Sequence, residues 1–137
     1  MKTKINILLL FAIIELIGIS SCKKYEEGPV LSLRFKNARV AGVWTYDKVT
    51  VSGNDFTSLY ANEKVEFTKD GKAKWTYSSA LSKDGEWKFN DDKSKLMTKF
   101  DNVSTWIEYE IIKLRNDQLW LKKTEGNSIT EYQLGSK

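Results

Sequence analysis

The stretch that decides the fold covers residues 65–77 and reads VEFTKDGKAKWTY. Apolar and polar residues alternate on both sides of Asp70-Gly71, and an Asp-Gly pair between two alternating segments is the strongest short-range signal for a β-hairpin. In the second arm Ala73, Trp75 and Tyr77 share one face, because side chains two residues apart lie on the same side of a strand. The stretch therefore predicts an antiparallel hairpin with one apolar face.

Working outward from this hairpin, the same alternation recurs along the chain and predicts eight strands. They cover residues 43–51, 65–68, 73–77, 85–89, 96–100, 105–114, 119–122 and 129–134. Short polar turns join nearly all of them, and short connections imply antiparallel neighbours. The fold class is therefore all-β, an eight-stranded antiparallel up-and-down β-barrel, which leaves no free edge. A sandwich of two sheets is the alternative. The one long connection covers residues 52–62.

The N-terminus combines Lys2 and Lys4, an apolar run from Ile5 to Ile19, and Ser20-Ser21-Cys22, which holds the only cysteine. This order resembles the lipobox of bacterial lipoproteins. The resemblance implies cleavage before Cys22, a diacylglyceryl thioether on its sulfur and acylation of the new N-terminus. The 15-residue run is short for a membrane-spanning helix, which needs roughly 20 residues. An uncleaved anchor is the alternative.

Three segments follow from this assignment. Residues 1–21 are expected to be a lipoprotein signal peptide, residues 22–37 a lipidated tether with a short helix, and residues 38–137 the barrel domain. The acidic pair Glu26-Glu27 in the tether looks like the surface-export signals of Bacteroidetes-type lipoproteins, and an ordinary solvated linker is the alternative. Apolar residues at helical spacing between residues 31 and 40 predict a lead-in helix of one or two turns.

Composition excludes several kinds of activity. The chain has no histidine, so it lacks the commonest general base and transition-metal ligand. Charged residues make up 29% of the chain, with a net charge of +4 and no dense basic block, which argues against binding nucleic acid. We therefore expect no catalytic residues, no metal site and no cofactor.

Two polar clusters contain residue types that occur in catalytic or metal sites. Glu108 and Glu110 share a strand face about 6.5–7 Å apart, a spacing that can suggest glycoside hydrolysis, but a solvated strand face is favoured. Asn90-Asp91-Asp92 could contact calcium, although hairpin turns routinely use these residue types.

Gly42-Val43-Trp44 opens the first predicted strand just after the helix-like segment. Together with Phe67-Thr68-Lys69-Asp70-Gly71 and Gly85-Glu86-Trp87, it resembles the lipocalin-like family of Bacteroidetes lipoproteins over residues 38–134. The resemblance implies that Trp44 plugs the closed end of the barrel and that residues 52–62 border the open end as a candidate lid. The chain departs from lipocalins in having no arginine after Arg115, so it is similar to a short, divergent branch and no particular ligand is carried over.

An eight-stranded barrel either fills with side chains or holds one small ligand. The inward candidates to line a ligand cavity are Phe67, Trp75, Tyr77, Trp87, Phe89, Phe100 and Tyr109. An open cavity predicts a small hydrophobic ligand, whereas a filled barrel predicts a non-enzymatic interaction module. Trp106 and Trp120 are expected on the outer surface, where they could contact a glycan or an envelope protein unless lysine stems cover them.

The sequence thus predicts a lipid-anchored lipocalin-like protein of the cell envelope, held in the outer membrane through Cys22. A small hydrophobic ligand in the barrel is the expected partner. The pattern points to no particular oligomeric state.

Overall fold

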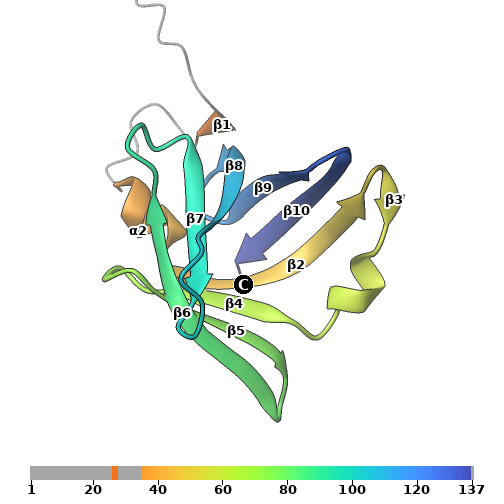
Figure 1. Ribbon diagram of the computed structural model, residues 1–137, viewed down its shortest axis with the longest axis horizontal. Coiled ribbons are helices and arrows are strands. Elements are labelled where there is room, and N and C mark those ends of the chain that lie inside the picture. Colours follow the sequence, from red (N-terminus) through yellow and green to blue (C-terminus); the bar gives the residue numbers. More distant parts are fainter. Residues whose placement is uncertain (1–25, 28–34, 137) are drawn as a thin grey trace, which may run out of the picture.

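In the computed structural model, which describes residues 26–27 and 35–136, eight strands close into a barrel (Figure 1). The strands are β2 (Gly42–Val51), β4 (Lys64–Phe67), β5 (Lys72–Ser78), β6 (Leu81–Phe89), β7 (Lys95–Phe100), β8 (Ile107–Leu114), β9 (Gln118–Glu125) and β10 (Ser128–Ser136). Each pairs antiparallel with the next along this order, and β10 returns to pair with β2. This closure confirms the up-and-down barrel and excludes the two-sheet sandwich.

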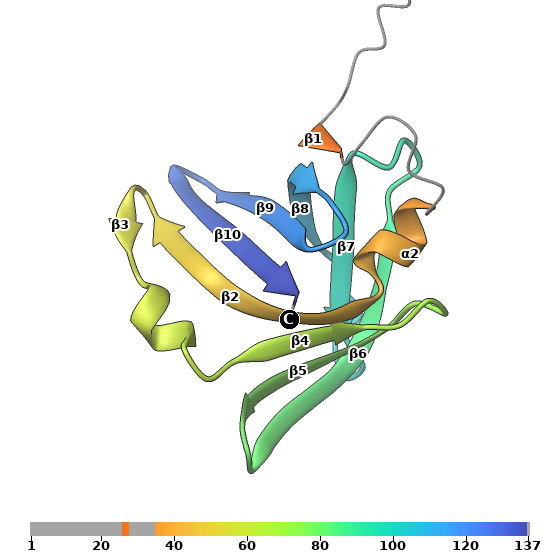
Figure 2. The ribbon, with the colours of Figure 1, turned by 180° about the vertical axis from the view of Figure 1, so that it is seen from behind.

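Four shorter elements accompany the barrel. In the long connection, β3 (Asn54–Asp55) pairs with β2 and is followed by the 3-10 helix η1 (Thr57–Tyr60). Before the barrel, β1 (Glu26–Glu27) pairs parallel with β8, and α2 (Lys36–Val40) forms the predicted lead-in helix. The signal peptide, Cys22 and most of the tether lie outside the described residues. In both ribbon views α2 and η1 lie on opposite sides of the barrel (Figure 2).

The hairpin that decides the fold adopts the expected turn. Gly71 has a φ of +87°, a left-handed conformation that glycine adopts without strain. The Thr68 hydroxyl hydrogen-bonds the Asp70 carboxylate, and the Trp87 backbone N–H donates to the Gly71 carbonyl over 2.9 Å. The turn is therefore held by a contact within itself and by a hydrogen bond to β6.

The core occupies the half of the barrel nearest α2. Trp44 is 1% exposed, and its indole N–H donates to the carbonyl of Val40, the last residue of α2, over 2.8 Å. Buried side chains from β4 to β10 complete the cluster: Val65, Phe67, Ala73, Trp87, Leu96, Ile111, Leu114, Leu119, Leu121 and Leu134. Trp44 is thus buried and hydrogen-bonded to the end of α2, while its role as a plug stays a prediction.

The closed fold lies within a short part of the chain. All eight barrel strands and every residue of the buried apolar cluster fall between Val40 and Ser136. A fragment of residues 23–137 therefore contains the complete ring of strands and its core, and it is expected to fold independently. Within the described part of the chain, no helix has the length and apolar character needed to cross a membrane.

Candidate functional site

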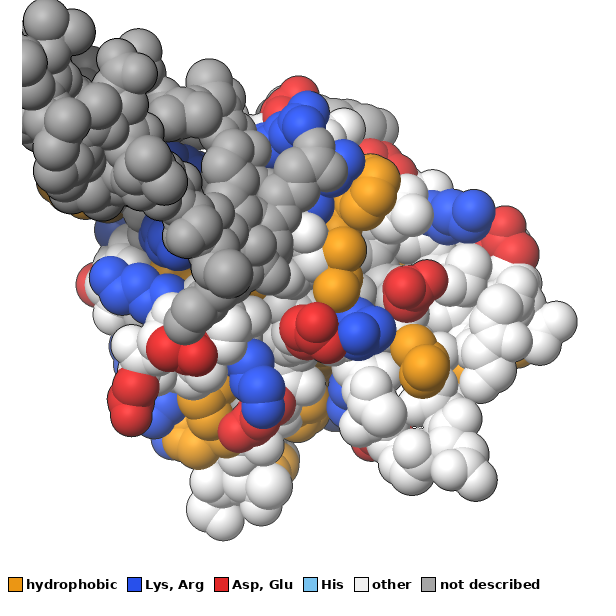
Figure 3. Space-filling model, turned by 90° about the horizontal axis from the view of Figure 1, so that it is seen from above, with side chains coloured by type: hydrophobic (Ala, Val, Ile, Leu, Met, Phe, Trp, Pro, Cys, Tyr) orange, Lys and Arg blue, Asp and Glu red, His pale blue; other side chains and the backbone are white. Residues whose placement is uncertain are grey.

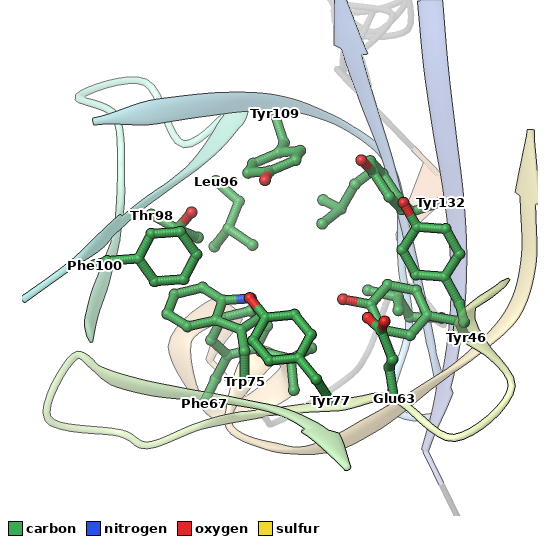
Figure 4. Close-up of a pocket in the computed structure, with 14 residues that line it drawn as sticks. Tyr46, Glu63, Phe67, Trp75, Tyr77, Leu96, Thr98, Phe100, Tyr109 and Tyr132 are labelled. Atoms are coloured by element: carbon green, nitrogen blue, oxygen red, sulfur yellow. The ribbon is translucent and has the colours of Figure 1, made fainter. Parts of the chain in front are cut away.

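The half of the barrel away from α2 contains a cavity of about 210 Å³ (Figure 4). Its wall is mostly aromatic and aliphatic, with tyrosine hydroxyls, one threonine and one carboxylate as polar groups. The residues that line it are Tyr46, Tyr60, Glu63, Val65, Phe67, Trp75, Tyr77, Leu96, Thr98, Phe100, Tyr109, Leu121, Tyr132 and Leu134. A concave, mainly apolar wall with a few polar groups is typical of small-molecule sites.

Four tyrosines form a connected group in this wall, here named the tyrosine cluster: Tyr46, Tyr60, Tyr109 and Tyr132. The ring centroids of Tyr46 and Tyr60 are 5.0 Å apart, and those of Tyr109 and Tyr132 are 5.9 Å apart. Tyr132 also lies 6.1 Å from Tyr46 and 6.2 Å from Tyr60. These separations are those of favourable aromatic pairs, so the rings hold one another in place around the cavity.

Burial favours the neutral form of four phenols in the wall. It raises the pKa of Tyr46 and Tyr132 strongly and that of Tyr109 and Tyr77 less, because an ionised phenolate would lose its hydration. Negative charges nearby act in the same direction. The wall therefore offers neutral hydroxyls, each able to donate or accept a hydrogen bond.

The long connection between β2 and β4 contributes two wall residues. Tyr60 closes η1 and extends its ring toward Tyr46, and the backbone N–H of Glu63 donates to the Tyr60 carbonyl over 3.0 Å. The Thr57 hydroxyl accepts from the Val49 N–H over 3.0 Å, which ties η1 to β2. The candidate lid thus forms part of the cavity wall, while its opening and closing stay a prediction.

Five of the seven cavity candidates lie in the wall: Phe67, Trp75, Tyr77, Phe100 and Tyr109. Trp87 and Phe89 do not, which corrects that part of the prediction. Trp87 is 4% exposed, donates its indole N–H to the Thr68 carbonyl over 2.8 Å, and packs edge-on against Phe67 and Phe89. Alternation along a strand predicts which side of the sheet a residue faces, but it does not predict its height along the barrel axis.

Trp106 and Trp120 are half-buried rather than exposed. The Lys88 ammonium lies 4.4 Å from the centroid of the Trp106 ring, and that of Lys113 lies 3.7 Å from Trp120. These are cation–π contacts, and they correct the expectation of open aromatic faces in favour of the lysine-covered alternative. A role for either tryptophan in contacting a glycan or an envelope protein stays a prediction.

The polar clusters on the outside of the barrel have structural partners. Glu108 and Glu110 are exposed, and each forms a 2.6 Å ion pair, with Lys95 and Lys122 respectively. On the face shown in Figure 3, acidic and basic side chains are interspersed and form no patch of a single sign. The exposed, lysine-paired Glu108 and Glu110 therefore fit a solvated strand face rather than a glycoside-hydrolase site.

The turn after β6 uses its side chains to hold its own backbone. The Asn90 amide donates to the Asp92 carboxylate over 2.9 Å, and the same carboxylate accepts from the Ser94 N–H over 3.0 Å. Across residues 26–27 and 35–136, no group of three acidic or cysteine side chains is arranged to hold a metal ion.

The sequence-based prediction of the cavity included Tyr109 but missed the other three tyrosines of the cluster. It also missed Glu63. Tyr46 and Tyr132 lie on β2 and β10, the first and last strands of the barrel, and these pair only because the barrel closes. Thr98 was missed because a polar residue on a strand suggests the outer face, yet it is buried. Tyr46 could have been found from its spacing: it lies two residues after Trp44 on β2, so both side chains face the same side of the sheet.

Comparison with solved structures agrees with this architecture. A crystal structure of a lipocalin-like protein from Bacteroides uniformis superposes with a TM-score of 0.57 and 13% sequence identity, covering 72% of this chain and 99% of that chain. No family model matches the sequence, and no curated protein matches it either. The protein thus has a lipocalin-like barrel fold, reached by a sequence far from that of its structural neighbour.

Proposed function

We propose that this protein binds a small, mostly apolar molecule in its barrel cavity, as a lipid-anchored binding protein of the cell envelope. The observation that best supports this proposal is that side chains fill the barrel only in the half nearest α2. The cavity of about 210 Å³ in the other half keeps an aromatic wall instead of collapsing. Aromatic walls with neutral hydroxyls suit a compact, partly aromatic ligand.

The size of the cavity limits the ligand. Its volume corresponds to about seven water molecules at roughly 30 Å³ each. This is below the roughly 300–1,000 Å³ of typical small-molecule sites. A long acyl chain would not fit inside, so the ligand is a small molecule about the size of a substituted benzene.

Binding can be measured by titrating residues 23–137 with tert-butylbenzene while following tryptophan fluorescence. Trp75 lies in the wall, with its ring centroid 4.7 Å from that of Phe100, so an occupant should change its emission. Trp75→Ala should weaken binding at least tenfold, which is about 1.4 kcal/mol. Because this variant loses its reporter ring, its affinity is measured by calorimetry.

The matched control is Trp106→Ala, which removes an indole from outside the cavity. It should leave the affinity of the probe unchanged. A filled barrel predicts a different result for Trp75→Ala: a stability loss of about 3–5 kcal/mol, with no binding to lose. That combination would contradict the proposal.

The anchor is supported by the order of apolar run, small residues and Cys22 in the sequence. Cys22→Ser should leave the precursor unlipidated and shift it out of membrane fractions, because the acyl chains supply the membrane affinity. Radiolabelled palmitate incorporation with fractionation measures both effects. Unchanged membrane retention of the variant would contradict the anchor.

A further inference from the structure

The wall of the cavity contains an acidic side chain but no basic one, and the apolar character of the wall does not explain this imbalance. Among the residues that line the cavity, Glu63 is the only one with a carboxylate, and none is a lysine or arginine. The chain as a whole has a net charge of +4, so a wall without cations runs against the overall balance. Glu63 is directed toward the cavity from the end of the long connection (Figure 4).

In the part of the chain that the structure describes, Glu63 forms no ion pair with a lysine, unlike four other glutamates. Those four are Glu86, Glu108, Glu110 and Glu125. Glu63 is half-buried, and burial raises its pKa above the usual range. A half-buried carboxylate without a cation is favourable only if something else offsets its lost hydration.

Carboxylates near the cavity act on its tyrosines in one direction. The charge of Glu63 raises the pKa of Tyr46 and Tyr77, and the charge of Glu125 raises that of Tyr109 and Tyr132, in each case after the larger effect of burial. The wall thus has one carboxylate and no cationic side chain, an arrangement that favours cations over anions.

The rings beside Glu63 add a second attraction for positive charge. Tyrosine and tryptophan faces carry a negative quadrupole that attracts cations within about 6 Å of the ring centroid. Tyr46 and Tyr60, with ring centroids 5.0 Å apart, lie in the same wall as Glu63, and Trp75 and Tyr77 complete it. The ammonium of Lys83 lies 5.2 Å from the Phe100 ring centroid, but Lys83 is exposed and is not one of the lining residues.

We propose that the cavity selects a small organic cation, a quaternary ammonium or a protonated amine, whose positive group lies beside Glu63 against the faces of Tyr46 and Tyr60. Any apolar part of the ligand then packs against Trp75 and Phe100. This inference rests on the proposed function, since it names the chemical class of the ligand for the same cavity.

The test compares two probes of equal shape and different charge. Trimethylphenylammonium is a permanent cation, and tert-butylbenzene is its neutral carbon isostere, so shape and apolar contact are matched. Calorimetric titration of residues 23–137 at neutral pH should give an affinity for the cation at least tenfold higher than that for the isostere. Benzoate, an anion that also carries a benzene ring, should not bind measurably.

Glu63→Gln removes the charge and keeps the shape. It should lower the affinity for the cation at least fivefold and leave that for tert-butylbenzene unchanged. The matched control is Glu66→Gln, the same change at an exposed position of β4 three residues away, which should change neither affinity. Should Glu63→Gln fail to fold, Tyr60→Leu tests the ring face instead, with the same selective loss for the cation.

The outcomes separate the two proposals. Equal or tighter binding of tert-butylbenzene, or a Glu63→Gln variant that keeps full affinity for the cation, would overturn the cation inference while leaving a binding cavity. Failure of both probes to bind would overturn the proposed function itself for ligands of this size, and the inference with it.

Discussion

At the scale of single residues, Trp44 joins the first strand to the helix that covers the closed end. Its ring is 1% exposed and its indole N–H bonds Val40 at a distance of 2.8 Å. Trp44→Ala should therefore lower the free energy of unfolding by about 3–5 kcal/mol, measured by urea denaturation. Trp106→Ala, which truncates a half-buried outer ring, should cost clearly less. Equal losses in the two variants would show that Trp44 is no plug.

Glu63 should make cation binding depend on pH. Protonation removes its charge, so affinity for trimethylphenylammonium should fall as the pH is lowered through the pKa of Glu63. Because burial raises that pKa, the loss should begin at a higher pH than an exposed glutamate would give. Tyr46 and Tyr77, whose pKa values the charge of Glu63 affects, stay neutral in this range, since burial raises their pKa values as well.

The probe itself cannot titrate, which leaves the protein as the only source of this effect. Calorimetric titrations between pH 4 and pH 7, roughly the range in which glutamates titrate, measure it, and tert-butylbenzene is the neutral reference. In Glu63→Gln the pH dependence should disappear. A dependence that persists in the variant would place the titrating group elsewhere.

At the scale of elements, the close approach of β6 to β7 requires Gly85. A Cβ at this position would lie 2.1 Å from the backbone oxygen of Lys99 and 2.8 Å from the Trp75 ring. Gly85→Ala should therefore destabilise the protein by about 1–3 kcal/mol and displace Trp75 from the cavity wall. Urea unfolding and tryptophan emission measure the two effects.

A control on the same strand is available in Ser82, which is exposed. Ser82→Ala should change stability by less than about 0.5 kcal/mol. If Gly85→Ala changed stability as little as Ser82→Ala, the inference that β6 and β7 pack too tightly for a side chain at position 85 would be wrong.

The elements were also the part of the fold that the sequence predicted best. All eight strands follow from alternation and turn residues, because both signals are local: Ala73, Trp75 and Tyr77 face inward as their spacing requires. The half-filled interior could not be predicted in the same way. Whether Trp87 fills the closed half and Trp75 lines a cavity depends on the stagger between strands, which alternation within one strand does not contain.

At the scale of the whole molecule, the buried tyrosines predict how stability depends on pH. Unfolded tyrosines ionise near pH 10, whereas the folded pKa values of Tyr46 and Tyr132 lie well above that. Tyr46 and Tyr132 therefore contribute fully to the free energy of unfolding below pH 10. This contribution is lost progressively as the pH rises beyond 10, because the unfolded state then binds fewer protons than the folded state.

Thermal unfolding between pH 8 and pH 11, a range that spans the ordinary tyrosine pKa near 10, should show this decline. Tyr46→Phe should make the decline shallower, since a phenylalanine cannot ionise in the unfolded chain. An equal slope in the variant would show that Tyr46 is not held neutral by the fold.

The most direct test of the binding account is to identify what the protein carries. Residues 23–137, purified from a bacterial host without detergent, would be weighed by native mass spectrometry and then extracted with organic solvent. A ligand-binding barrel predicts a stoichiometric adduct of one small molecule, released by the extraction and reduced in Trp75→Ala. A clean apo mass, together with no uptake of either trimethylphenylammonium or tert-butylbenzene, would contradict a ligand-binding barrel.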